Sequence, residues 1–273
     1  MERTLTLAER LVRSTVRIDC FSNHQYVSGG TGFFVDPPKQ RPNERRLFLV
    51  SNRHILCAPE ADYFRLFLRT YDGMRTQIEP IFFYKHSVVS HPVEEVDLAA
   101  VDITPYCIVS NPLDYVPISM GMLPENWEML DAIEDIIMIG YPDLKIGADF
   151  FPIVRKGITA TSLQHKYLGM DRFLADIPVF CGSSGSPIFI YSQGSRFERH
   201  PDGSMTNTLG MPQALFVGIQ SGGYKVPNEL VGPDEKKVDG VTAKTFMNLA
   251  VVEKSNQLSI LLEQIVGTHP KGS

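Results

Sequence analysis

The feature that most constrains the fold of this chain is a succession of short apolar runs. Many of these runs are rich in Val, Ile and Phe and are bounded by Gly, Pro, Asn or Asp, which is typical of strands separated by turns. They occupy residues 15–21, 26–35, 47–51, 64–69, 77–84, 98–103, 136–139, 151–160, 172–177, 186–191, 214–220 and 245–251. Because long helices do not alternate with them, the pattern predicts an all-β sandwich or barrel rather than an α/β fold.

Helices are expected only near the two ends, as a short one over 6–12 and a longer one over 255–266. The second carries a helical apolar stripe, with Ser255 as a plausible cap. Four stretches with turn-rich or mixed composition are expected to be loops: 36–46, 104–126, 193–212 and 225–244. The stretch 104–126 has strands on both sides, so it is the best candidate for a linker. It would divide the chain into an N-terminal unit over 1–118 and a C-terminal unit over 119–273.

Charge and hydropathy argue against several classes of partner. At 43% hydrophobic residues the chain has enough apolar side chains for a large core. Its net charge of -5 supplies no basic field, so neither nucleic acid nor an anionic membrane is an expected partner. No apolar run approaches the roughly 20 residues that would span a bilayer. Charged residues such as Glu9 and Arg10 interrupt the first apolar stretch, which argues against a signal peptide. We therefore expect a cytosolic protein, while a mature secreted form with an added Met would look the same.

The cysteines predict no metal site. Cys20, Cys57, Cys107 and Cys181 show neither C-x-x-C nor zinc-ligand spacing. Buried, reduced thiols are the expected state, rather than disulfides. No metal or other cofactor is expected.

Residues 180–187 read FCGSSGSP and hold three serines and two glycines between apolar runs. Such a stretch could be a Gly/Ser turn between two strands, or it could hold a nucleophile. A serine hydroxyl attacks well only beside a base that is itself oriented by a third group, with backbone N–H donors where negative charge develops.

Among the histidines and carboxylates, two stand in unusual contexts. His54 follows the apolar run at 47–50, and Asp97 opens the apolar run in VEEVDLAAVDI. Asp102 lies inside that second run and is the weaker candidate. Each of these signals is weak alone, because a lone histidine at a strand end is more often a satisfied structural residue.

Taken in order, the segments GTGFFV, SNRHIL, DLAAV, GSSGSP and VGIQSGG resemble the chymotrypsin/trypsin-like serine peptidases. Within them the chain looks most like the HtrA-like and glutamyl-endopeptidase-like bacterial branches, and the resemblance runs from about residue 16 to 266. HtrA-like enzymes often have a PDZ domain after the protease, and we expect none here. The resemblance implies two six-stranded antiparallel β-barrels with a C-terminal helix.

The resemblance also implies the role of each site residue. Ser184 would be the nucleophile, His54 the general base, and Asp97 the residue that orients the imidazole. The backbone N–H groups of Gly182 and Ser184 would form the oxyanion hole. The elbow of the α/β-hydrolases does not fit, because it needs Gly-x-Ser-x-Gly and Ser186 stands two positions after Ser184.

One departure concerns activation. Digestive trypsins have an aspartate before the nucleophile, and it pairs with an N-terminus released by cleavage. Ser183 carries no charge at this position. The sequence therefore predicts activity without N-terminal processing.

Other departures concern the substrate. Ser221, Gly222 and Gly223 would pair with the substrate main chain as an added strand. Gln220 stands where glutamyl endopeptidases carry a histidine for acidic side chains, and Val179 lies near the expected base of the S1 pocket, where trypsins have an aspartate. We expect a small or medium, apolar or uncharged P1 residue. Cys181 could be a redox switch or only a small side chain lining the site.

Three functional hypotheses remain. The first is an active serine endopeptidase acting on a protein or peptide. The second is a catalytically silent module that keeps the fold and binds extended peptides. The third is a protease that stays silent until a regulatory protein binds.

Overall fold

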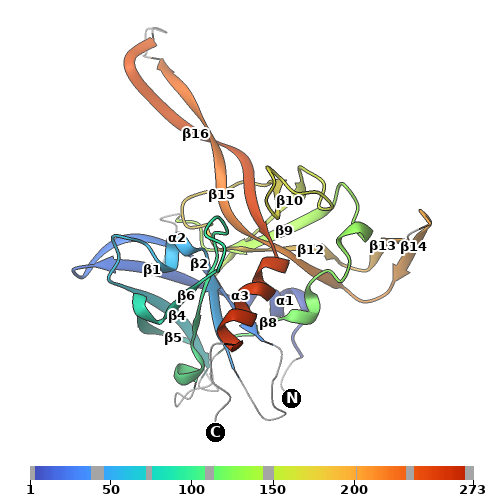
Figure 1. Cartoon of the computed structure of the whole chain (residues 1–273), viewed down its shortest axis with the longest axis horizontal. Coiled ribbons are helices and arrows are strands. Elements are labelled where there is room, and N and C mark those ends of the chain that lie inside the picture. The colour runs from blue at the N-terminus through green and yellow to red at the C-terminus, as the bar shows by residue number, and fades with distance from the viewer. Residues whose placement is uncertain are drawn as a thin grey trace.

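A computed structural model of the chain describes residues 4–37, 46–71, 76–107, 114–143, 151–200, 202–231 and 237–267. Its strands form an eight-stranded open sheet, a closed six-stranded barrel and a separate two-stranded hairpin. The open sheet comes from the first part of the chain and the closed barrel from the second (Figure 1). The expectation of a mostly β protein with a six-stranded barrel and a C-terminal helix is confirmed. The first of the two expected six-stranded barrels is instead an open half-barrel of eight strands, because its two edge strands do not pair with each other in the described part of the chain.

The half-barrel is built from strands in the order β5-β4-β1-β2-β3-β7-β6, with β8 pairing in parallel with the far end of β2. Every other pair in it is antiparallel. Its strands are β1 (Thr15–Ser22), β2 (Gln25–Asp36), β3 (Phe48–Ser51), β4 (Tyr63–Tyr71), β5 (Thr76–Tyr84), β6 (Val88–Ser90), β7 (Ala99–Asp102) and β8 (Ile118–Ser119). Strand β3 is apolar in three of its four positions, and all four residues are buried.

The barrel closes in the order β10-β11-β16-β15-β12-β9, with antiparallel neighbours throughout. Its strands are β9 (Asp135–Gly140), β10 (Ile153–Thr159), β11 (Arg172–Asp176), β12 (Pro187–Ser192), β15 (Gln213–Val231) and β16 (Lys237–Lys254). Because the strands close into a barrel, their inward side chains fill a continuous core.

In the part of the chain that the structure describes, three short helices accompany the sheets: α1 (Leu7–Val12), α2 (Arg53–Leu56) and α3 (Asn256–Gly267). In α1, Thr6 and Glu9 form a capping box, in which each side chain accepts a hydrogen bond from the other's backbone N–H. Both helices predicted from the sequence are therefore present, and α2 is an addition of one turn.

The half-barrel and the barrel share a core. The rings of Phe33 in β2 and Phe216 in β15 meet at 5.4 Å between centroids, and Phe189 in β12 lies 5.4 Å from Phe216 on the other side. All three are fully buried. Residues of α3 pack into the same cluster. This shared apolar contact fixes the two sheets against each other.

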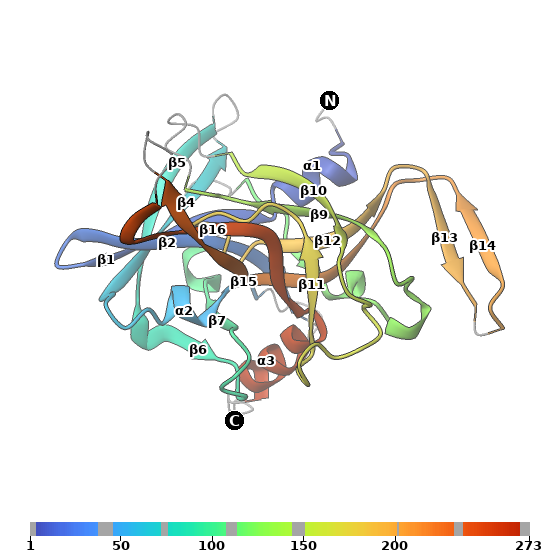
Figure 2. The ribbon, with the colours of Figure 1, turned by 90° about the horizontal axis from the view of Figure 1, so that it is seen from above.

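Two stretches that we expected to be loops contain strands. Residues 193–212 fold into the hairpin of β13 (Ser195–Arg199) and β14 (Met205–Leu209). Residues 225–244 lie largely in long extensions of β15 and β16, which pair with each other and rise far out of the barrel (Figure 1). Figure 2 views the same pair of strands from above. The polar composition indicated loops, but the backbone pairing of two neighbouring segments does not need a buried face.

The expected linker at 104–126 contains regular elements in its described residues. It contains the 3-10 turns Thr104–Cys107 and Met120–Met122 and the short strand β8. Residues 108–113 lie outside the described part, as do 38–45 within the expected loop 36–46. Two further 3-10 turns, Lys85–Ser87 and Trp127–Met129, complete the regular elements of the described residues.

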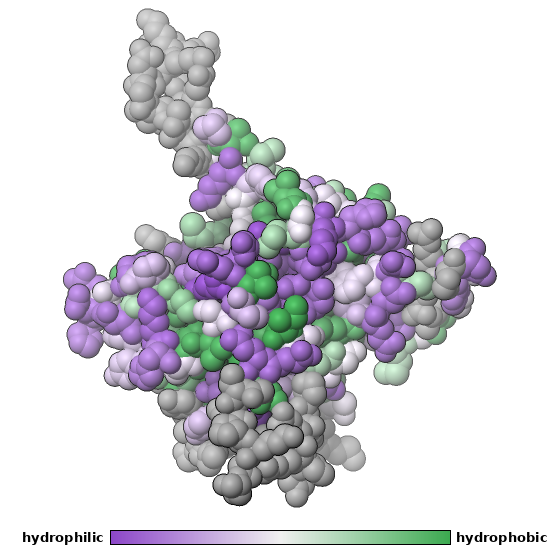
Figure 3. Space-filling view, viewed as in Figure 1, coloured by the Kyte–Doolittle hydropathy of each residue, from purple (hydrophilic) through white to green (hydrophobic). Residues whose placement is uncertain are grey.

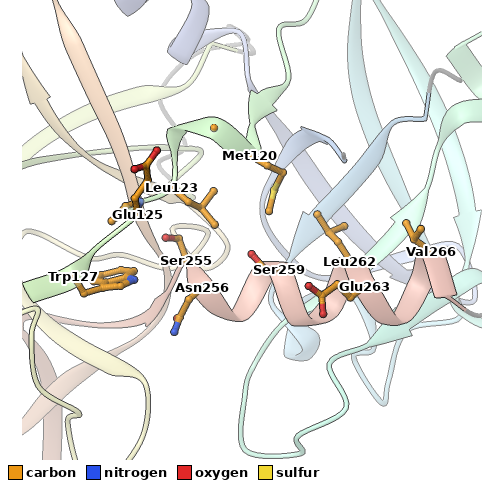
Figure 4. A pocket seen from close by; sticks show the side chains of 12 residues that line it. Met120, Leu123, Glu125, Trp127, Ser255, Asn256, Ser259, Leu262, Glu263 and Val266 are labelled. Carbon is orange, nitrogen blue, oxygen red and sulfur yellow. The ribbon is translucent and has the colours of Figure 1, made fainter. Parts of the chain in front are cut away.

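A pocket of about 690 Å³ lies between α3 and the segment before β9 (Figure 4). Met120, Leu123 and Trp127 line one side, and Leu262 and Val266 of α3 line the other. Elsewhere, the face seen in Figure 3 is mainly polar, with apolar residues in small groups. Within the described residues, no helix combines the length and apolar character that crossing a bilayer requires, and no group of side chains is arranged to bind a metal ion.

Candidate active site

His54 sits in α2, directly after the buried strand β3. Asn52 caps this one-turn helix with an extended backbone, and its side-chain Nδ2 donates to the carbonyl of Asp97 at 2.9 Å. The turn of helix directs His54 outward, so that its side chain is 46% exposed while Ile55 and Leu56 are buried. The His54 imidazole is therefore exposed to solvent, while the buried residues Ile55 and Leu56 hold α2 in place.

Asp97 lies two residues before β7, which pairs with β3. Its Oδ2 is 2.6 Å from His54 Nδ1, and its Oδ1 accepts the backbone N–H of His54 at 3.0 Å. Both carboxylate oxygens thus contact one residue. A carboxylate at Nδ1 favours the tautomer that has its proton on Nδ1, which leaves Nε2 as a base.

The stretch 180–187 forms a compact turn before β12. Gly182 and Gly185 have φ values of +86° and +87°, a region that favours glycine. The amides of Ser183, Gly185 and Ser186 donate to the carbonyls of Phe180, Gln220 and Ser183. Among the described residues no acceptor is recorded for the amides of Gly182 and Ser184. These two N–H groups are the ones that an oxyanion hole would use.

Thr31 of β2 connects the half-barrel to this turn, a role that the motif GTGFFV did not predict for it. Its N–H donates to the carbonyl of Ser184 at 2.8 Å, and its Oγ1 donates to the carbonyl of Gly182 at 2.9 Å. The same Oγ1 accepts the N–H of Tyr141 at 2.8 Å. Ser51, at the end of β3, donates from Oγ to the carbonyl of Thr31 at 2.6 Å. Hydrogen bonds therefore link β3, β2 and the turn.

Gly30 shows how close the turn lies to the helix that carries His54. A Cβ placed on Gly30 would be 3.0 Å from the side chain of Ile55 in α2 and 3.0 Å from the carbonyl oxygen of Ser184. The backbone of Ser184 is therefore next to α2. No hydrogen bond from Ser184 Oγ to His54 is recorded among the described residues. Such bonds are often long before a substrate binds and shorten in the complex.

The predicted substrate-binding residues lie on β15, except for Val179. Gln220 holds the turn by its backbone, since its N–H donates to the carbonyl of Ser186 and its carbonyl accepts from Gly185. Its side chain is buried and donates from Nε2 to the carbonyl of Gly222 at 2.9 Å. Ser221 and Gly223 follow in the same strand. Val179 is buried in the core of the barrel.

Ser183 and Cys181 occupy different environments. Ser183 is buried, and its Oγ accepts the N–H of Phe180 at 3.3 Å, so this position is satisfied without a charged partner. Cys181 is exposed, and its carbonyl accepts the N–H of Asp143 at 2.6 Å. The expectation of buried thiols holds for Cys20 and is wrong for Cys181, because the turn directs the side chain of Cys181 to solvent.

Neither a family model nor a curated protein matches this sequence. Solved structures do. The structure of HL collagenase is 13% identical, covers 94% of this chain and 94% of its own, and gives a TM-score of 0.48. The scabies mite inactivated protease paralogue S-D1 is 9% identical, covers 96% of this chain and 97% of its own, and gives a TM-score of 0.50. The second likeness shows the chymotrypsin-like fold alone, which is the fold predicted from the sequence.

Proposed function

We propose that this chain is a serine endopeptidase that hydrolyses peptide bonds with Ser184, His54 and Asp97. The observation that carries the proposal is the pairing of both Asp97 oxygens with His54, beside a turn whose amides at Gly182 and Ser184 have no recorded acceptor among the described residues. A carboxylate-oriented histidine next to two such donors is the arrangement that acyl transfer requires.

In the proposed reaction, Ser184 Oγ attacks the scissile carbonyl carbon while its proton passes to His54 Nε2. The carbonyl π electrons move onto oxygen, and the N–H groups of Gly182 and Ser184 stabilise the resulting oxyanion. His54 then gives the proton to the amide nitrogen, the C–N bond breaks, and the amine leaves an acyl-enzyme. Water attacks the ester by the same route and frees Ser184. Asp97 holds the imidazole and stabilises the imidazolium.

The proposed substrate is an extended segment of a protein or peptide. Beyond Gln220, β15 no longer pairs with β12, so Gly222 and Gly223 pair with β16 on one side only, and Ser221 lies at a register shift between them and Gln220. This leaves an edge to which a substrate strand can add. We propose a small or medium, uncharged P1 residue, because neither Gln220 nor Val179 brings a charge to the expected pocket.

A second candidate function is a silent, peptide-binding module. The observation that favours it is the absence, among the described residues, of a recorded hydrogen bond from Ser184 Oγ. A related hypothesis is that a regulatory protein must bind before this bond forms. Both keep the same peptide-binding edge and differ from the first proposal only in whether Ser184 reacts.

A fluorophosphonate probe on the unprocessed chain separates these hypotheses. If the endopeptidase proposal is right, the probe labels the purified protein, and Ser184→Ala abolishes labelling. Ser183→Ala is the matched control, because it removes the neighbouring hydroxyl of the same turn. Its labelling should remain. Labelling that appears only with cell extract supports the regulated enzyme, whereas no labelling under any condition supports the silent module and overturns the proposal.

A further inference from the structure

The segment that carries Asp97 is a surface loop held by hydrogen bonds to its backbone. Residues 92–95 are exposed, and His91 and Val96 are buried on either side of them. A loop of this kind has few apolar contacts to fix it, so its carbonyl groups are the natural points of attachment. The position of Asp97 relative to His54 depends on what holds these carbonyls, together with the bond from Asn52 to the carbonyl of Asp97 and the burial of Val96.

One side of the loop is held from within the half-barrel. Arg53, next to His54 in α2, donates to three carbonyls of the loop: from Nη1 to Glu94 at 2.6 Å, and from Nη2 to His91 at 2.8 Å and Val93 at 3.1 Å. The planar guanidinium suits this task, because its donors are fixed in a fork.

The other side is held from the barrel. Arg172 of β11 donates from Nη2 to the carbonyl of Glu95. Its Nε and Nη2 both contact Glu253 Oε1 at 2.7 Å. Arg172 and Glu253 face each other in the register of β11 and β16, so the ion pair is part of the barrel wall. One guanidinium therefore connects the barrel to the loop that carries Asp97.

Glu253 is an unusual residue for a barrel wall. It is 1% exposed, and its Oε2 has no hydrogen-bond partner among the described residues. Burial raises the pKa of Glu253 most strongly; Arg172 and the backbone N–H of Asp97 lower it, and the Asp97 carboxylate raises it. The net direction is upward. Because the groups of Asp97 act on Glu253, the two carboxylates lie within electrostatic reach of each other.

We propose that Arg172 and Glu253 are positioning residues for Asp97. Glu253 fixes the direction of the guanidinium, the guanidinium fixes the carbonyl of Glu95, and the loop then presents the Asp97 carboxylate to His54. A buried ion pair often stabilises a protein no better than apolar residues of similar size would. The role of the Arg172–Glu253 ion pair is then to place the loop that carries Asp97. The inference deepens the proposed function, since it concerns the same site.

The test measures two independent properties in Glu253→Gln and Arg172→Lys. The first is the rate of fluorophosphonate labelling. The second is the ¹⁵N chemical shifts of the His54 ring nitrogens, which report the tautomer whether or not Ser184 reacts. Val252→Ala is the control, because Val252 is the buried neighbour of Glu253 in β16 and belongs to the barrel core. It lowers global stability without removing a contact to the loop.

We expect both variants to label at least tenfold more slowly and to lose part of the Nδ1–H tautomer of His54, while Val252→Ala keeps both properties. The double variant should lose no more than the stronger single variant, because both substitutions break one chain of contacts. If Glu253→Gln does not fold, Arg172→Lys alone tests the inference. A lysine ammonium lacks the fixed set of donors with which the guanidinium binds Glu253 and the carbonyl of Glu95 together.

Wild-type rates and tautomer populations in the variants would overturn the inference. A wild-type protein that never reacts with the probe would instead overturn the proposed function, and the ring-nitrogen shifts would still decide whether Arg172 and Glu253 position Asp97.

Discussion

His54 and Asp97 make two contacts with each other, one through the ring and one through the backbone. Oδ2 of Asp97 lies 2.6 Å from Nδ1 of the imidazole, and Oδ1 accepts the N–H of the same residue at 3.0 Å. The bond from the backbone N–H restricts rotation of the Asp97 carboxylate, so Oδ2 stays directed at the ring. This double contact distinguishes Asp97 from the other carboxylates near the ends of β7.

Asp97→Asn should lower the rate of probe labelling by about 10⁴-fold, as the equivalent change does in serine proteases with a Ser-His-Asp triad. An amide offers its NH₂ or its oxygen to Nδ1 and no longer fixes the reactive tautomer. Asp102→Asn is the matched control, since Asp102 is the last residue of β7, the strand that follows Asp97, and it pairs with Arg46 instead of His54. Its labelling rate should stay within about twofold of wild type. Equal losses in the two variants would contradict the assignment of Asp97.

Asp102→Asn should instead change the free energy of unfolding, and by an amount that depends on pH. Burial acts most strongly on its pKa and raises it, but hydrogen bonds from Thr104 and Arg46 outweigh burial and leave the pKa lowered. A lowered pKa in the folded state means that the carboxylate stabilises the fold above its unfolded pKa of about 3.9, and that this contribution is lost as the pH falls through the folded value. The stability difference between wild type and Asp102→Asn should therefore be largest near neutral pH.

Urea unfolding followed by the fluorescence of Trp127, the one tryptophan of the chain, measures this difference. We expect the difference to shrink between about pH 4 and pH 2. A difference that stays constant over this range would show that Asp102 acts through packing rather than through its charge.

Two of the cysteines should differ in reactivity. Cys20 is buried, and burial, the strongest of several influences, raises the pKa of its thiol to about 11. Cys181 is exposed beside Gly182. At pH 8, iodoacetamide should modify Cys181 at least about 10²-fold faster than Cys20, because the thiolate is the reactive form. Peptide mapping by mass spectrometry measures both rates, with Cys181→Ser as the control. Comparable rates would contradict the predicted environments.

The strands and the order of the site segments could be predicted from the sequence because both depend on local patterns. Apolar runs ended by turn residues gave β1 to β5 nearly to the residue, and His54 stood out because it follows a buried run. The extended arm of β15 and β16 was missed, because its sequence is polar and its strands pair with each other through the backbone, which leaves no hydrophobic pattern to detect.

The residues that hold the site together could not be predicted, since their roles arise from long-range contacts. Thr31 reads as an ordinary strand residue, yet it binds Gly182 and Ser184, which are more than 150 positions away in sequence. Likewise, Arg172 and Glu253 are common residue types whose meaning depends on the loop that packs against them. Hydrophobic periodicity carries no information about such contacts.

Gly182 provides the sharpest test of the oxyanion turn. Its φ of +86° is strained for any side chain, and an added Cβ would lie 2.5 Å from the carbonyl oxygen of Tyr141 and 2.6 Å from the nitrogen of Asp143. Both atoms belong to the backbone, so the turn itself must move and its N–H must change direction. Gly182→Ala should slow labelling by about 10²- to 10³-fold, the usual effect of losing one oxyanion donor.

Gly169→Ala separates backbone strain from this effect. Gly169 has a similar φ of +77°, but an added Cβ there meets no atom within 4 Å. Both variants should lose about 1–2 kcal/mol of stability from the left-handed backbone, whereas only Gly182→Ala should react slowly. Stability is measured by urea unfolding and reactivity by the labelling rate. Equal labelling rates in the two variants would place the oxyanion donor elsewhere, because a Cβ at Gly182 cannot be accommodated without moving the amide that the mechanism needs.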